Sequence, residues 1–129
     1  MKRYKLSVFF ISVFASVVFT ACYYDKEDNL YGNIPCKTGA ISYVNDVAPV
    51  LNANCYACHS TSNAPILGSN IKLDSYANLT AYLQNSQSAF TGSINQDGSV
   101  SPMPKGGTKL AKCNLQLITD WISQGKLDN

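Results

Sequence analysis

Charged residues are scarce in this chain of 129 residues. Charged residues make up 14% and aromatic residues 11%, whereas disordered chains have more charge and fewer aromatic residues. The formal net charge of +2 includes Lys2, Arg3 and Lys5, which belong to a segment that we expect to be removed. The remaining seven Lys and eight Asp and Glu leave a net charge of −1, which argues against nucleic-acid binding.

Histidine and methionine are almost absent, which restricts the metal chemistry open to the chain. His59 is the single histidine, so one chain cannot form a two-histidine zinc site. Met103 is the single methionine after Met1. Cysteine, in contrast, occurs five times, and the spacing suggests three separate roles for Cys22, Cys36, Cys55, Cys58 and Cys113.

The N-terminus has the features of an export signal. A basic start at 1–5 is followed by an apolar run at 6–19 and the small residues Thr20 and Ala21. The apolar run is shorter than the roughly 20 residues that a membrane span requires. Cys22 directly follows and resembles the lipidated cysteine of bacterial lipoproteins, with an ordinary secretory signal as the alternative.

These features divide the chain into three segments. We expect a lipoprotein signal peptide at 1–21, a lipidated Cys22 with a flexible tether at 22–35, and one domain at 36–129. The tether is polar and without an apolar period, so it would span about 20 Å on average. Removal of the signal leaves 108 residues, which suits a single domain and not a two-domain enzyme.

Two features of the tether bear on location. Tyr23 differs from the aspartate that retains lipoproteins in the inner membrane, and residues 26–28 resemble the acidic surface-export tag of some Bacteroidetes-type lipoproteins. The expected location is therefore the bacterial cell envelope. The lipid anchor would hold the chain to the outer membrane, on its periplasmic side or at the cell surface.

The residues from Cys55 to His59 form the pattern CxxCH, which in an exported chain indicates covalent attachment of a c-type haem. Cys55 and Cys58 stand at i and i+3, so on a helical turn both sulfurs face one way and can form thioethers to one porphyrin edge. His59 follows at once and can bind the iron. A thioredoxin-like disulfide would need a βαβ setting, and a zinc site would need a fourth ligand.

Met103 is the expected second axial ligand of the iron, because the only histidine is already used. It lies between Pro102 and Pro104 in a glycine-rich loop, and each proline fixes its own φ and pushes the residue before it toward extended geometry. Core packing is the alternative role for a lone methionine. Lys105 or Lys109 could replace it as ligand, although we expect both to face water.

Taken together, these motifs resemble a small class I cytochrome c of the single-haem lipoprotein type common in Bacteroidetes. The matching stretches, within 36–127, are 46–51 with Cys55 to His59, 102–107 with Leu110, and 113–125. The resemblance implies an all-α fold with three to four helices around one covalently bound haem c. It also implies that a backbone carbonyl of the loop after His59 accepts a hydrogen bond from its Nδ1, and Pro65 is the local candidate.

The residues around the motif predict a first helix and a loop that could cover a haem. Asp46 is a suitable N-cap, and an apolar stripe places Val47, Leu51, Cys55 and Cys58 on one buried face. Residues 60–73 lack a clear period and predict a loop. Haem cover or ordinary core packing explains its apolar side chains equally well: Ile66, Leu67, Ile71 and Leu73.

Two further helices are expected. Asp74 or Ser75 would cap a middle helix at 75–86, with an apolar stripe of Tyr76, Leu79 and Leu83, and 86–101 would be a long loop. The last helix would cover 113–124, and the resemblance implies that it crosses the first. Its side chains Leu117 and Trp121 face one way, and Gly125 is a natural C-terminal cap. Trp121 is expected in the core and not as an electron relay.

Cys36 and Cys113 remain after these assignments. In an oxidising compartment two remaining cysteines favour one disulfide, with two buried free thiols as the alternative. The bond would close a loop of 78 residues. The chain-entropy treatment assigns up to about 4 kcal/mol of stabilisation to such a loop.

The function that these features favour is a membrane-anchored electron carrier and not an enzyme. Its iron would cycle between Fe(II) and Fe(III) with His59 and Met103 as axial ligands, and its partners would be transient redox proteins. The main alternative is a haem enzyme or a gas or peroxide sensor with an open sixth position. It is disfavoured because no second histidine and no arginine remain. An accessory module of a larger surface complex is a third possibility.

Overall fold

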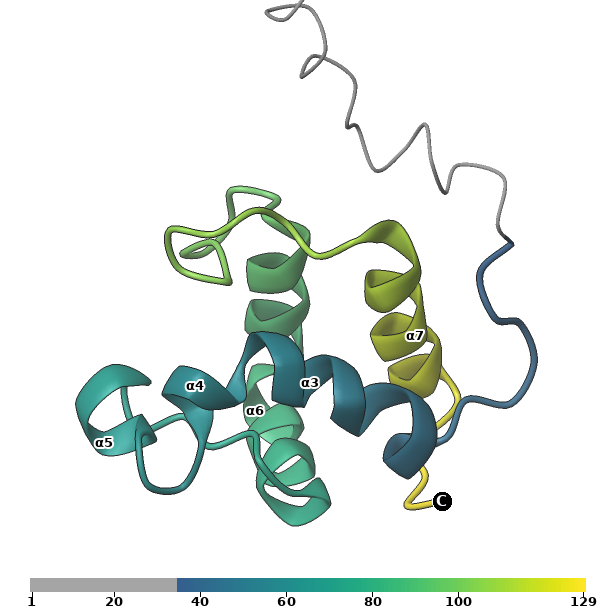
Figure 1. Ribbon diagram of the computed structural model, residues 1–129, viewed down its shortest axis with the longest axis horizontal. Helices are drawn as coiled ribbons and strands as arrows, with labels where there is room; N and C mark the ends of the chain where they lie inside the picture. The colour runs from purple at the N-terminus through teal and green to yellow at the C-terminus, as the bar shows by residue number, and fades with distance from the viewer. Residues whose placement is uncertain (1–34) are drawn as a thin grey trace, which may run out of the picture. The chain divides into compact units, whose positions relative to one another are not determined.

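The computed structural model describes residues 35–129, and these residues form helices and no strand (Figure 1). The elements are η1 (Tyr43–Val47), α3 (Ala48–Asn54), α4 (Tyr56–His59), α5 (Ala64–Leu67), α6 (Tyr76–Asn95) and α7 (Lys112–Ser123). Residues 36–129 belong to one compact unit, and the all-α prediction is confirmed for the described residues. The predicted signal at 1–21, the lipidation site Cys22 and nearly all of the tether lie outside them.

The first helical segment begins earlier than predicted. Ser42 is the N-cap, with its hydroxyl accepting from the Asn45 N–H at 3.2 Å. The prediction of Asp46 as N-cap is wrong, because its carboxylate instead accepts from the backbone N–H of Ser42 at 2.8 Å. The two bonds work like a capping box, with the carboxylate one position later because the first turn is a wider π-turn.

The apolar stripe of this segment is interrupted at the haem-attachment motif. Val47 and Leu51 are fully buried, as predicted. Helix α3 ends at Asn54. Cys55 has the non-helical φ of −125°, so the helix is broken there before α4 begins at Tyr56. Cys55 is therefore half-buried while Cys58 is exposed, and the prediction that both cysteines share the buried face is wrong for Cys58.

Helix α6 is longer than the predicted middle helix. It begins after Ser75, whose hydroxyl accepts from the Asn78 N–H at 3.1 Å, and this confirms one of the two proposed caps. The helix continues past a kink at Ser86 to Asn95, so the predicted loop at 86–101 is wrong over its first ten residues. Leu79 and Leu83 are buried as predicted, and further along the helix Phe90 and Ile94 are buried too, so core packing stabilises this polar stretch.

The last helix agrees with its prediction. Trp121 is fully buried, and its indole N–H donates to the Leu127 carbonyl at 2.9 Å. The centroids of the Trp121 and Tyr43 rings lie 5.6 Å apart. This contact belongs to the packing of α7 against η1. Gly125 ends the helix with φ +97°.

The predicted disulfide is present. Cys36 and Cys113 are bonded, and their Cα atoms lie 5.1 Å apart. The bond joins the beginning of the compact unit to the first turn of α7. Within residues 35–129, no helix is both long enough and apolar enough to cross a membrane.

Candidate functional site

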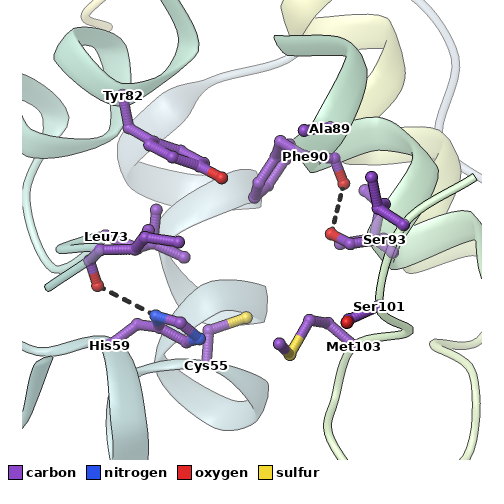
Figure 2. Close-up of a pocket in the computed structure, with 12 residues that line it drawn as sticks. Cys55, His59, Leu73, Tyr82, Ala89, Phe90, Ser93, Ser101 and Met103 are labelled. Carbon is purple, nitrogen blue, oxygen red and sulfur yellow. Dashed lines mark hydrogen bonds between the residues drawn. The ribbon is translucent and has the colours of Figure 1, made fainter. Parts of the chain in front are cut away.

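A cavity of about 260 Å³ lies between α4, the loop that follows it, helix α6 and the loop that leads to α7. Three of the four residues predicted to hold a cofactor line it: Cys55, His59 and Met103. Figure 2 shows Cys55 and His59 on one side and Met103 on the other, with the methionine side chain directed toward them. The remaining lining residues are Ile71, Leu73, Tyr82, Ala89, Phe90, Ser93, Ile94, Val100 and Ser101.

The His59 ring is held by a backbone carbonyl, as the resemblance implied. Its Nδ1 lies 2.9 Å from the carbonyl oxygen of Ile71. Because a carbonyl can only accept, Nδ1 is the donor, and in the neutral ring the lone pair then belongs to Nε2. The prediction of Pro65 as acceptor is wrong, because the chain turns back after α5 and brings the carbonyl of Ile71 to the ring.

The loop after His59 is closed by hydrogen bonds at its two ends. The Leu73 N–H donates to the His59 carbonyl at 2.8 Å. One residue further on, the Asp74 carboxylate accepts from the backbone N–H and the hydroxyl of Thr61, the latter at 2.9 Å. The N–H of Thr61 is the main cause that lowers the pKa of Asp74, and the Asn78 amide adds a bond at 2.9 Å.

Met103 is positioned by the end of α6. Its N–H donates to the Ser93 carbonyl at 2.9 Å, and its own carbonyl accepts from the Gln96 side chain at 3.2 Å. The peptide bond to Pro104 is cis. Lys105 and Lys109 are exposed, as predicted.

The two cysteines of the motif differ in environment. Burial raises the pKa of the Cys55 thiol to about 11, so it is neutral at pH 7. Cys58 is exposed and does not line the cavity. Both are free thiols, so the structure does not contain the disulfide alternative.

The apolar lining only partly follows the sequence-based prediction. Ile71 and Leu73 line the cavity, as one of their two predicted roles requires. Ile66 and Leu67 are 84% and 61% exposed on the short helix α5 and do not line the cavity, so the prediction that they pack in the core is wrong, and haem cover by them stays a prediction.

Five lining residues from α6 were not predicted: Tyr82, Ala89, Phe90, Ser93 and Ile94. They belong to one helix face, with the rings of Tyr82 and Phe90 6.4 Å apart in an edge-to-face arrangement. The spacing of these residues along the chain was a usable signal. The surrounding serine, glycine and asparagine residues mask that signal because they favour a loop.

In the part of the chain that the structure describes, no three side chains of His, Cys, Asp or Glu gather into a metal-ion site. An iron held by one histidine and one methionine thioether would not need such a group. Comparison of the chain with protein-family models, with curated proteins and with solved structures found no match.

Proposed function

We propose that this chain is a single-haem class I c-type cytochrome that carries electrons and is not an enzyme. The observation that supports the proposal best is the cavity itself. It brings the Cys55 thiol and the His59 imidazole of a CxxCH motif to the same space as Met103, which stands 44 residues further along the chain. A histidine nitrogen and a methionine sulfur are the axial pair of many cytochromes c.

The residues around the cavity suit a flat apolar macrocycle. The walls include the apolar side chains of Leu73, Phe90 and Ile94, which are almost completely buried. The volume, about 260 Å³, lies just below the range for small-molecule sites, roughly 300–1,000 Å³. Cys58 lies outside the cavity at the surface, so a thioether from it would form at an exposed edge.

Each residue of the site then has a defined role. Cys55 and Cys58 would provide the two thioether sulfurs, and His59 and Met103 the two axial ligands. The bond from His59 Nδ1 to the Ile71 carbonyl fixes the ring and makes Nε2 a stronger donor. When bound, haem c supplies a one-electron Fe(II)/Fe(III) couple, which the methionine sulfur biases toward the reduced state.

Location and partners complete the proposal. Lipidation at Cys22 would anchor the domain to the outer membrane of a bacterial cell envelope, since several acyl chains together hold almost permanently. Its partners would be redox proteins that bind briefly over a small surface. The charge of −1 that remains after removal of the signal predicts little electrostatic steering of those encounters.

The absorption spectrum of the exported protein tests the proposal, with wild type compared with Met103→Ala. We expect six-coordinate, low-spin haem in wild type, with the weak long-wavelength band typical of methionine bound to Fe(III). Met103→Ala should lose that band and bind carbon monoxide. Lys105→Ala, an exposed change in the same loop, is the matched control and should keep the wild-type spectrum.

Two other results would contradict the proposal in different ways. High-spin haem that binds carbon monoxide in wild type would favour the enzyme or sensor alternative. An unchanged spectrum in Met103→Ala would remove Met103 as a ligand.

A further inference from the structure

Gly68 is buried directly after α5 and lies against the His59 ring. A Cβ atom at this position would be 2.5 Å from the carbonyl oxygen of Cys58 and 2.9 Å from Nδ1 of His59. Both distances are shorter than non-bonded heavy atoms tolerate. The backbone of Gly68 has φ −110° and ψ 17°, so an alanine is excluded by space and not by backbone conformation.

Gly68 also begins the turn that returns the chain to the ring. Its carbonyl accepts from the Ile71 N–H at 2.9 Å. The two residues between them, Ser69 and Asn70, have φ of 52° and 62°, which is the backbone of a primed turn. The Ala64 carbonyl accepts from the N–H groups of both Gly68 and Asn70, at 3.1 and 2.8 Å, and so ties the turn to α5.

The close approach and the turn serve one contact. The turn places the carbonyl of Ile71 2.9 Å from His59 Nδ1, and Gly68 leaves the ring enough room to stay in that orientation. The other glycines of the described residues do not have this relation to a cofactor residue. A Cβ would meet open space at Gly39, Gly98, Gly106 and Gly125, the Ser99 and Asp97 side chains at Gly92, and Pro104 at Gly107.

We propose that Gly68 is a positioning residue that sets the orientation of the His59 ring and, through the Nδ1 hydrogen bond, the donor strength of Nε2. This inference rests on the proposed function, because donor strength at Nε2 has a consequence only when His59 binds iron. A hydrogen bond at Nδ1 makes Nε2 more basic and so favours Fe(III) over Fe(II). Loss of that bond shifts the couple toward the reduced state.

The test is Gly68→Ala in the haem-loaded full chain, measured by redox titration. We expect the ratio of oxidised to reduced protein at a fixed external potential to fall about tenfold. This corresponds to a rise of about 59 mV in the reduction potential of the one-electron couple. Ile118→Val is the matched control. It loosens the core at Ile118, which is fully buried and does not line the cavity, so it should lower the melting temperature and leave that ratio unchanged.

Asn70→Ala provides a second variant in case Gly68→Ala does not fold. It weakens the left-handed turn without placing an atom against the ring, and should shift the ratio in the same direction by a smaller factor. A wild-type ratio in Gly68→Ala would overturn the proposal, as would a wild-type ratio in Asn70→Ala if the first variant does not fold. A wild-type protein without any redox couple would instead contradict the proposed function.

Discussion

The two sides of the cavity are built differently, although both would bind the same iron. On the histidine side, the loop after His59 is closed on itself by backbone and side-chain bonds, including those between Thr61 and Asp74. On the methionine side, two hydrogen bonds hold Met103 to the end of α6, and residues 105–109 are all exposed.

This difference indicates which of the two side chains the fold holds more firmly. The histidine is fixed by local structure that forms within about 20 residues of chain. The methionine depends on a loop whose far end is held by the buried Leu110 and by the disulfide at Cys113. We therefore expect weakening of the fold to release Met103 before it disturbs His59.

The largest contrast is expected from removing each ligand in turn. His59→Ala should lower the yield of covalently haem-loaded protein by at least about tenfold, because even loss of a ligand's supporting bond costs 10–100-fold in metal affinity. Met103→Ala should keep a yield close to wild type. Haem staining of denaturing gels measures both. Equal losses in the two variants would contradict the expectation that haem attachment needs His59 and does not need Met103.

Breaking the disulfide should weaken the methionine side next. Cys113→Ser should lower the free energy of unfolding by about 2–4 kcal/mol, since the bond closes a long loop. It should also raise the rate at which carbon monoxide displaces Met103 from the reduced protein. Chemical denaturation and rapid mixing measure these effects. Cys36→Ser should behave identically, and a large loss in only one variant would contradict the explanation.

Acid should act on the histidine side through Asp74. Its pKa lies below the unfolded value of about 3.9, so its contribution to stability is present above about pH 4 and disappears as the pH falls through the lowered pKa. Asp74→Asn should lower stability at pH 7 by about 1–2 kcal/mol and flatten its acid dependence. Thermal melts between pH 7 and pH 2 measure this.

Asp97→Asn is the matched control for Asp74. The pKa of Asp97 is also lowered, but by Ser99, only two residues away, so its bonds close no loop. We expect this variant to lose less stability at pH 7 than Asp74→Asn. The reverse order would mean that the loop closure near His59 is unimportant.

The smallest effect is expected at Gln96. Its side-chain amide donates to the Met103 carbonyl, and Gln96→Ala should cost about 0.5–1 kcal/mol. Carbon monoxide should then displace Met103 several-fold faster. The hydrogen bond between His59 and Ile71, and its effect on the reduction potential, should stay unchanged. Gln84→Ala, an exposed change on α6 away from the loop, is the control. Identical displacement rates in Gln96→Ala and wild type would show that this bond does not hold the loop.

The sequence predicted the side chains that could bind a cofactor better than it predicted the backbone that supports them. Cys55, His59 and Met103 belong to rare residue types with motif spacing, so they could be identified without a structure. The Ile71 carbonyl could not, because every residue has a carbonyl and only the turn at 68–71 selects this one. Gly68 could not be identified from the sequence either, because only its position in the structure distinguishes it from the other glycines.

Helix lengths were predicted where local signals agreed and missed where packing overrode them. Helix α7 combines an apolar stripe with a glycine stop, and its prediction is confirmed within a residue. The second half of α6 is polar and held by the buried Phe90 and Ile94, which single-sequence propensity underweights. The exposure of Ile66 likewise depends on where the chain turns and not on its apolar character.

The mass of one peptide tests the central claim most directly. Cleavage of the exported, matured protein after Lys37 and Lys72 releases residues 38–72, which contain both Cys55 and Cys58. Covalent attachment predicts that this peptide absorbs visible light and is heavier by one haem. A colourless peptide of unmodified mass, from a host that matures other c-type cytochromes, would contradict the claim.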